Sequence, residues 1–210
     1  MAHIVLMNDA DALEAVFKKH AGSIAAMLFE PIMGNCLGIA ADPQYVKDVR
    51  ALCDRYGVLL IIDEVKTGFR VARGGVQQLY GVNADLCTFA KAVGNGYPIS
   101  VLAGREEIMR RLGRGVAHGG TYTAHSVSLA AAEATLKIIR DTDALEHIAD
   151  YGTKLRDGMG RVLTARRHPA QLHRPSFDDR PLFRGRAAAH LSPLEEQRLQ
   201  LLRCHGPGAA

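Results

Sequence analysis

The hydrophobic pattern of this chain alternates between short apolar runs and amphipathic stretches. Residues 24–29, 58–62 and 86–89 form mostly apolar runs of strand length, whereas residues 43–56 carry apolar side chains at helical spacing. A helix between two buried strands forms a βαβ unit, which predicts a parallel strand pair with a right-handed crossover. The pattern therefore predicts an α/β fold with a mostly parallel sheet flanked by helices.

Polar residues and glycines mark where the expected helices begin and end. Asp42 and Pro43 have the form of an N-cap followed by a first-turn proline, and Gly57 has the form of a C-cap. Capping-box patterns begin at Asp11 and at Asp143. The other expected elements are helices over residues 8–20, 106–112, 126–141 (capped by Ser126 or Ser128) and 143–162, one helical turn over 77–80, a strand over 99–103, and irregular loops over 66–75 and 113–125.

Two of the expected strands stop at a charged residue. Asp63 follows the run 58–62, and Lys91 follows the run 86–89. In parallel sheets the ligand lies beyond the carboxyl ends of the strands, so both side chains can reach one crevice. An amine there can form a Schiff base with a carbonyl cofactor, and a carboxylate can keep a ring nitrogen protonated. These properties indicate pyridoxal phosphate, although the spacing of 28 positions (91 − 63) is by itself a weak signal.

Four short motifs strengthen this interpretation because they occur in order and at familiar spacing. Together they resemble the large domain of class III pyridoxal-phosphate-dependent aminotransferases, especially the glutamate-1-semialdehyde 2,1-aminomutase-like branch. The resemblance runs from about Ile4 to about Thr164 and implies part of a fold type I large domain over residues 1–164. The motifs are Glu30–Asn35, Asp63–Arg70, Thr88–Pro98 and His118–Tyr122.

The resemblance implies a role for five residues. Lys91 would bind the cofactor covalently and shuttle the proton between the substrate Cα and C4′, and Asp63 would pair with the pyridinium nitrogen. Val65 would pack against the ring, on the same side as Asp63 if the strand continues. Thr121 would reach the cofactor phosphate of the partner subunit, and Glu30 would lie at the floor of the site. The alternative interpretations are a surface lysine, a loop-capping aspartate, a core valine, a turn threonine and a structural glutamate.

Three nearby residues are interpreted without a role in the site. Lys66 departs from the commonest family pattern, in which a glutamine or apolar residue meets the phenolic oxygen of the ring, and a solvated lysine is expected. His118 and His125 flank Thr121 without any metal-ligand spacing, so both are expected to be loop residues.

The activity implied by the resemblance is transfer of an amino group between an amino acid or amine and a carbonyl compound. An aminomutase outcome uses the same residues, and the intact family forms homodimers. Because the resemblance covers only part of the family's site, we expect impaired activity and exposed apolar faces in this chain. Two alternatives stay open: a non-catalytic remnant or dimerising partner, and a pyridoxal-phosphate-dependent amino-acid racemase.

Composition changes sharply at residue 165. Residues 1–164 hold 18 Lys and Arg against 18 Asp and Glu, whereas residues 165–210 hold 8 Arg against 4 acidic residues, so the net charge of +4 lies entirely in the tail. Five of the eight prolines also lie there. We expect residues 165–210 to be a low-complexity basic tail, disordered or produced by a shifted reading frame, with one helix over Ser192–Arg203; a divergent linker is the alternative.

Composition also argues against several other functions. The balanced charge of residues 1–164 does not suit a nucleic-acid surface, and no apolar run approaches the roughly 18 residues of a membrane span. The cysteines lack CxxC spacing and no secretory leader precedes them, which predicts reduced thiols in the cytoplasm and no metal site. The four cysteines are Cys36, Cys53, Cys87 and Cys204.

Overall fold

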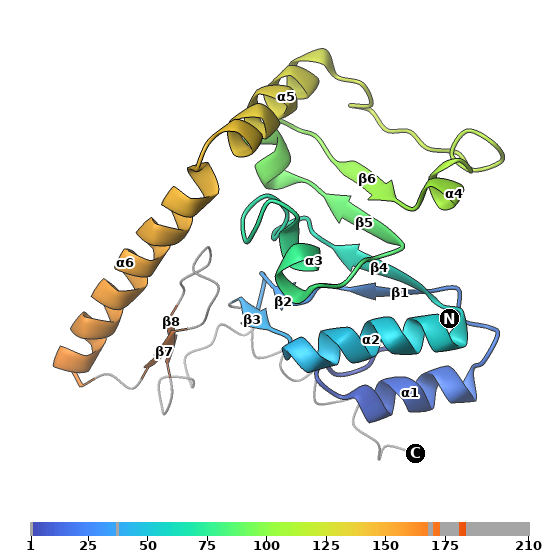
Figure 1. The fold of residues 1–210 in the computed structure, drawn as a ribbon, viewed down its shortest axis with the longest axis horizontal. Helices are drawn as coiled ribbons and strands as arrows, with labels where there is room; N and C mark the ends of the chain where they lie inside the picture. The colour runs from blue at the N-terminus through green and yellow to red at the C-terminus, as the bar shows by residue number, and fades with distance from the viewer. Residues whose placement is uncertain (1, 37, 168–169, 173–180, 184–210) are drawn as a thin grey trace.

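A four-stranded mixed sheet organises the computed structural model, which describes residues 2–36, 38–167, 170–172 and 181–183 (Figure 1). The strand order is β1-β4-β5-β6. The first three strands are parallel and β6 runs antiparallel to β5, so the predicted α/β fold is confirmed. The strands are β1 (Ala26–Phe29), β4 (Leu59–Asp63), β5 (Leu86–Phe89) and β6 (Val101–Gly104).

Helices and two short antiparallel strand pairs complete the described chain. One pair follows β1 directly and was not predicted from the sequence. The α-helices are α1 (Ala10–Lys19), α2 (Pro43–Tyr56), α3 (Gly75–Tyr80), α4 (Glu106–Met109), α5 (Ser126–Asp141) and α6 (Ala144–Ala165). The remaining elements are the 3-10 helix η1 (Lys91–Gly94), the pair β2 (Ile32–Met33) and β3 (Ile39–Ala40), and the pair β7 (Ala170–Leu172) and β8 (Pro181–Phe183).

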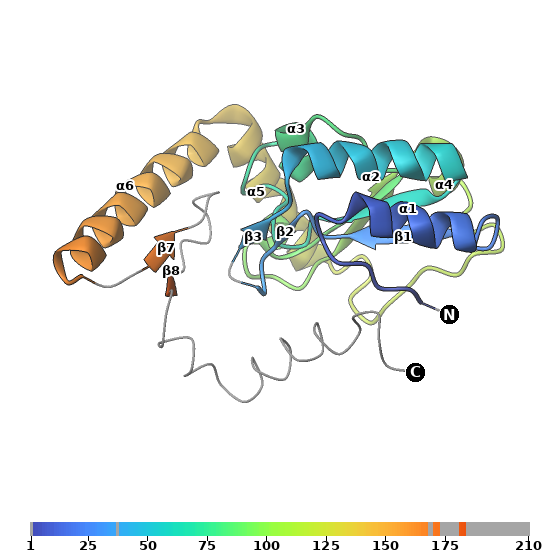
Figure 2. The same cartoon turned by 90° about the horizontal axis from the view of Figure 1, so that it is seen from below.

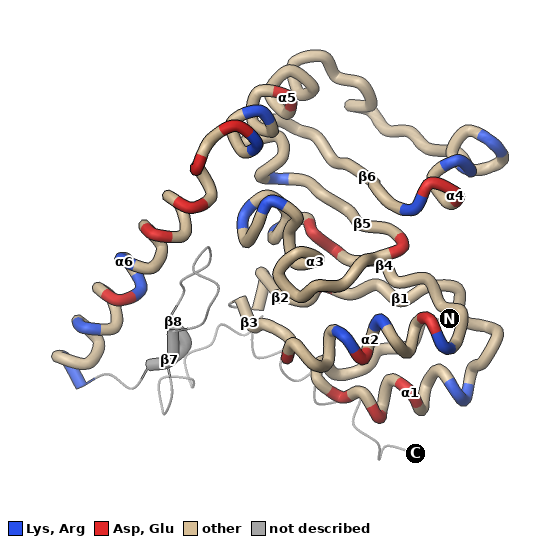
Figure 3. Tube along the Cα trace, viewed as in Figure 1, with Lys and Arg blue, Asp and Glu red and all other residues tan. Residues whose placement is uncertain are grey.

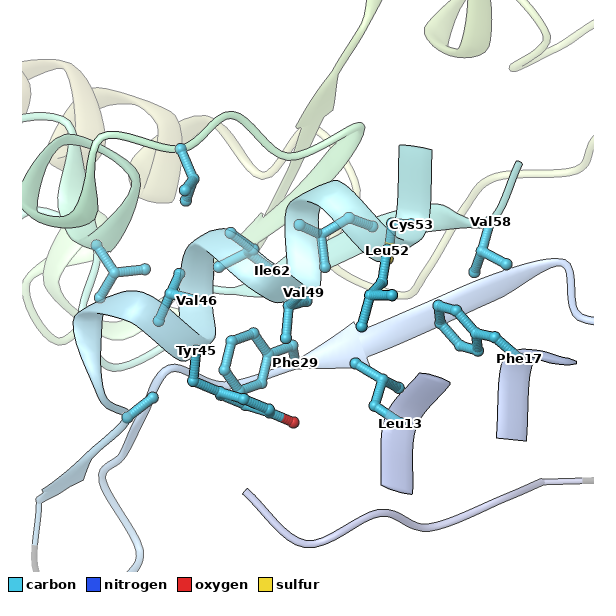
Figure 4. Packing of buried hydrophobic residues seen from close by; sticks show 14 of the residues in the cluster. Leu13, Phe17, Phe29, Tyr45, Val46, Val49, Leu52, Cys53, Val58 and Ile62 are labelled. Atoms are coloured by element: carbon cyan, nitrogen blue, oxygen red, sulfur yellow. The ribbon is translucent and has the colours of Figure 1, made fainter. Parts of the chain in front are cut away.

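The main core lies between helices α1 and α2 and one face of strands β1 and β4 (Figure 4). Leu13 and Phe17 of α1 face the stripe of α2 that begins at Val46, and Leu60 and Ile62 of β4 close the cluster from the sheet. The stripe of α2 is the one that its helical spacing predicted. Helices α1 and α2 also contact each other along this side of the sheet (Figure 2).

The sheet is covered unevenly. Phe29 of β1 is 7% exposed, whereas the preceding Leu28 is 68% exposed. Because neighbouring residues of a strand point to opposite faces, the face of β1 turned away from α2 is open. This agrees with the expectation of exposed apolar surface. Helix α5 packs against η1, and α6 extends away from the sheet (Figure 1).

Two predicted helix caps differ from the observed ones. Helix α1 is capped by Asp9, which accepts a hydrogen bond from the Ala12 amide at 2.8 Å, and not by Asp11. Glu14 forms no capping box and instead accepts hydrogen bonds from Arg55 at 2.8 Å and from Tyr56 at 3.2 Å, both on α2. A tertiary contact between α1 and α2 therefore replaces the expected local one.

The second differing cap is that of α5, and α6 lacks the predicted side-chain cap. Helix α5 is capped by His125, whose Nδ1 accepts from the Ser128 amide at 3.3 Å, and neither Ser126 nor Ser128 caps it as predicted. Helix α6 begins after Asp143 as expected, but the Asp143 side chain makes no capping hydrogen bond. His125 is thus a cap and not only a loop residue.

The tail contains structure that the sequence did not predict. Strands β7 and β8 pair antiparallel within residues 165–210, with Ala170 opposite Phe183. Residues 168–169, 173–180 and 184–210, which include the helix predicted over Ser192–Arg203, lie outside the described residues.

Candidate active site

Three strands bring charged residues to one edge of the sheet. Phe29 of β1 pairs with Ile62 of β4, so Glu30 follows at the level of Asp63. Asp63 in turn pairs with Thr88 of β5, three residues before Lys91. Figure 3 shows acidic and basic segments gathered after β4 and after β5 at this edge. The expected convergence of the strand ends is therefore present.

Asp63 is the last residue of β4 and turns the chain. Its Oδ1 accepts a hydrogen bond from the Val65 amide at 2.8 Å, an interaction that starts a turn directly after the strand. The strand does not continue to Val65, so the alternation on which its predicted orientation depended stops at Asp63. Both side chains are half-buried.

Lys91 begins the 3-10 helix that follows β5. Its φ is 50°, in the left-handed region that few residues other than glycine adopt. Such a backbone costs about 1–2 kcal/mol and is often found at functional sites. The turn is anchored by buried Val93 and by a hydrogen bond of 2.9 Å from the Asn95 amide to the Lys91 carbonyl. The Lys91 residue itself is exposed.

Burial and nearby charges shift the pKa of the Glu30 carboxyl. Burial raises the pKa of its carboxyl above 4.5, and the negative charge of Asp63 adds to this effect. A hydrogen bond of 3.1 Å from the Gly34 amide, together with the positive charges of Lys66 and Lys91, acts in the opposite direction but does not outweigh burial. Two carboxyls and two amines therefore share this edge of the sheet.

Lys66 combines a half-buried residue with an ammonium group at the surface. Its Nζ donates a solvent-exposed hydrogen bond of 2.7 Å to Asn35 Oδ1. Its aliphatic stem lies against Gly34, where a Cβ atom would overlap the Lys66 Cδ. The hairpin between β2 and β3 thus holds Lys66 at the site.

Glu64 is a structural residue of the site to which no role was assigned from the sequence. It is 0% exposed, and its carboxylate accepts hydrogen bonds from Thr67 Oγ1 at 2.6 Å, the Val76 amide at 3.1 Å and the Gln77 amide at 3.3 Å. A Cβ atom at Gly75, whose φ is +62°, would overlap this carboxylate. In the sequence, the pair Gly74 and Gly75 was the one feature that pointed to a close approach of Glu64.

Thr121 stays apart from these groups in the single chain. It is exposed in the loop between α4 and α5. In the part of the chain that the structure describes, no hydrogen bond connects Thr121 with Asp63 or Lys91. Its contact with a partner's cofactor phosphate stays a prediction.

The described residues show neither a metal-binding cluster nor a membrane-spanning helix. No group of three or more His, Cys, Asp or Glu side chains there could hold a metal ion. Nor does any described helix combine the length and apolarity that crossing a membrane requires.

Comparison with known proteins identifies the family. The family model for aminotransferase class-III matches residues 5–174, most of this chain. The chain belongs to the class-III aminotransferases. Glutamate-1-semialdehyde 2,1-aminomutase of Clostridium botulinum is 42% identical to it over 162 residues, which cover 76% of this chain and 38% of that enzyme. The enzyme of the same name from Caldivirga maquilingensis is 44% identical over 145 residues, covering 68% and 34% of the two chains.

Solved structures agree with this class-III aminotransferase assignment. The FumI protein of Sphingopyxis sp. MTA144, in its pyridoxal-phosphate internal aldimine form, aligns with a TM-score of 0.80 and 31% identity, covering 88% of this chain and 45% of that one. The chain therefore spans less than half the length of the relatives it matches. The family and its cofactor-bound members support pyridoxal phosphate as the cofactor.

The residues present fit this cofactor. An amine that follows one strand and a carboxylate at the end of its neighbour are the two groups that a carbonyl carbon and a basic ring nitrogen require.

Proposed function

We propose that this chain binds pyridoxal phosphate and serves the transfer of an amino group between an amino acid or amine and a carbonyl compound. The observation that carries the proposal is that Asp63 ends β4 and Lys91 begins the turn that follows the adjacent parallel strand β5. The class-III aminotransferase family supports the same reaction class.

Each residue of the edge has a distinct task in this proposal. Bound pyridoxal phosphate would supply an electron sink for the electrons released when the substrate loses a proton. Lys91 Nζ would hold the cofactor's carbonyl carbon and would later take the proton from the substrate Cα. The Asp63 carboxylate would accept a hydrogen bond from the ring nitrogen and keep its proton in place.

Neighbouring residues would shape the pocket. Val65, half-buried beside Asp63, would contact the ring face. Glu30, whose raised pKa reflects burial, would form the floor.

The curated relatives favour an aminomutase outcome within this reaction class. Both reported enzymes are named glutamate-1-semialdehyde 2,1-aminomutase. In an aminomutase the amino group returns to a neighbouring carbon of the same substrate, so the same acid and amine would serve both reactions. Incubation with an amino donor, with and without a separate carbonyl acceptor, distinguishes the two outcomes.

The proposal extends to assembly and location. We place Thr121 against the cofactor phosphate of a second copy in a homodimer, as the family resemblance implies. Its exposed position on a loop is compatible with such a contact. Cys36, Cys53 and Cys87 are free thiols, which supports a cytoplasmic location. Sedimentation analysis with and without Thr121→Ala tests the dimer contact.

The decisive experiment follows the covalent attachment of the cofactor. Purified protein is mixed with pyridoxal phosphate, its visible absorbance is recorded, and the adduct is fixed with borohydride for peptide mapping. We expect modification of Lys91 and its loss in Lys91→Ala, whereas Lys137→Ala on the exposed surface of α5 retains it. Asp63→Asn should weaken cofactor affinity about tenfold or more, because a charge-assisted hydrogen bond is lost. Absence of a specific adduct would favour the non-catalytic alternative.

A further inference from the structure

Lys66 carries a positive charge that acts on Glu30 at longer range, but its hydrogen bond goes to a neutral group. Its Nζ donates to the neutral amide oxygen of Asn35 at 2.7 Å. Among the residues that the structure describes, the recorded ion pairs do not include Lys66. An ammonium group has three N–H donors, so Asn35 occupies only one of them.

Two glycines allow close packing around the segment that carries Lys66. The stem of Lys66 lies against Gly34, whose amide donates to Glu30 at 3.1 Å. On the other side, Gly68 packs so closely on Phe89 that a Cβ atom there would overlap the ring, and the rings of Phe69 and Phe89 lie 5.3 Å apart. The segment that begins at Lys66 therefore packs against Phe89. This residue ends β5 and precedes Lys91 by two positions.

The neighbouring carboxyls do not serve as partners for Lys66. Asp63 is directed to the Val65 amide and, in the proposed function, to the ring nitrogen. Glu30 accepts a hydrogen bond from the Gly34 amide, and burial raises the pKa of its carboxyl. Lys66 thus adds a second amine to the group of charges around Glu30 that includes Lys91, with donors available for an anion.

We propose that Lys66, oriented by Asn35 and Gly34, binds the carboxylate of an amino-acid substrate. This inference rests on the proposed function and narrows its substrate class to amino acids and away from plain amines. The ammonium would form charge-assisted hydrogen bonds with the carboxylate, and these bonds would orient the substrate amine toward Lys91.

Matched ligand pairs test the proposal in cofactor-loaded protein. Each pair differs only by a carboxylate in place of a methyl group: 4-aminobutyrate with n-butylamine, and alanine with isopropylamine. The change in cofactor absorbance on titration gives an apparent Kd for each ligand. We expect the carboxylate-bearing member of at least one pair to bind about tenfold more tightly, as a charge-assisted hydrogen bond allows.

Variants separate charge from packing. Lys66→Met keeps the aliphatic contact with Gly34, and it should reduce the ratio of the two Kd values within each pair to about one. Lys66→Arg should retain most of it, and Lys137→Met on α5 should leave it as in the wild type. A preference that survives in Lys66→Met would overturn the proposal, and so would a wild-type chain with no preference in either pair.

A second measurement does not depend on the cofactor. An N-hydroxysuccinimide ester acylates accessible lysines, and peptide mass spectrometry follows the rate at Lys66. We expect butyrate to slow this rate saturably in the cofactor-free chain, whereas 1-butanol does not. Equal rates with both compounds would count against the carboxylate subsite. Failure of the proposed function has a different signature, namely no cofactor adduct at Lys91, while butyrate protection of Lys66 could still be observed.

Discussion

Replacement of Glu64 by alanine should destabilise the protein strongly. The substitution removes a fully buried carboxylate and leaves three donors without their acceptor: the Thr67 hydroxyl and the amides of Val76 and Gln77. A buried group that loses its hydrogen-bond partner costs about 1–3 kcal/mol. The Thr67 hydroxyl can rotate and the Gln77 amide is only partly buried, so the total should be about 3–5 kcal/mol and not the full sum.

The measurement is urea unfolding followed by far-UV circular dichroism, with the free energy of unfolding obtained by linear extrapolation. Glu64→Gln should lose less, because one amide oxygen can still accept, but its NH₂ group then faces a donor. Glu133→Ala on the exposed surface of α5 is the matched control and should leave the midpoint unchanged. A loss of less than about 1 kcal/mol in Glu64→Ala would show that the three bonds are not formed in solution.

The structure also predicts the effects of three further substitutions and the outcome of one cysteine-labelling experiment. Gly75→Ala should cost about 2–4 kcal/mol of unfolding free energy, because it adds overlap with Glu64 to an unfavourable positive φ, whereas Gly57→Ala, with φ +65° and open space around it, should cost only about 1 kcal/mol. Burial raises the pKa of the Asp85 carboxyl, but hydrogen bonds from two arginines and the Leu60 amide outweigh this effect and hold the pKa below 3.8. Asp85→Asn should therefore unfold at a lower urea concentration than the wild type at pH 7. The difference should shrink as the pH falls below 3.8, because the wild-type carboxylate then becomes protonated. Burial raises the pKa of the Cys53 thiol to about 11, so iodoacetamide at neutral pH should label half-buried Cys36 and leave Cys53 unmodified until the protein unfolds.

Local signals predicted those elements whose ends depend on nearby residues. Helix α2 shows this most clearly: Asp42 accepts from the Gln44 amide at 2.8 Å, and Gly57 adopts the left-handed φ of 65° that a helix C-cap requires. The apolar runs also identified β4 and β5, because a strand covered on its faces has few polar positions. The convergence of Asp63 and Lys91 then follows from the parallel register alone.

Caps that depend on tertiary contacts could not be predicted in the same way. Asp9 and Asp11 are equally suitable N-caps by residue type. The structure uses Asp9, and Glu14, which would complete a capping box with Asp11, bonds instead to Arg55 and Tyr56. No local pattern in residues 8–20 reports the approach of α2. The short pair of β2 and β3 escaped prediction for a related reason, since two-residue strands carry almost no periodic signal.

Glu64 and Lys66 show where sequence reasoning about the site reaches its limit. They lie two positions apart in a charged segment, yet one is fully buried and the other projects toward Asn35. Alternation cannot separate them, because β4 ends at Asp63 and the chain then turns. The burial of Glu64 depends on the return of the chain twelve residues later, where Gly75 admits the carboxylate to the first amides of α3. A buried acid after a strand is therefore best sought by looking for a glycine pair that precedes the next helix, since only a residue without Cβ allows so close an approach.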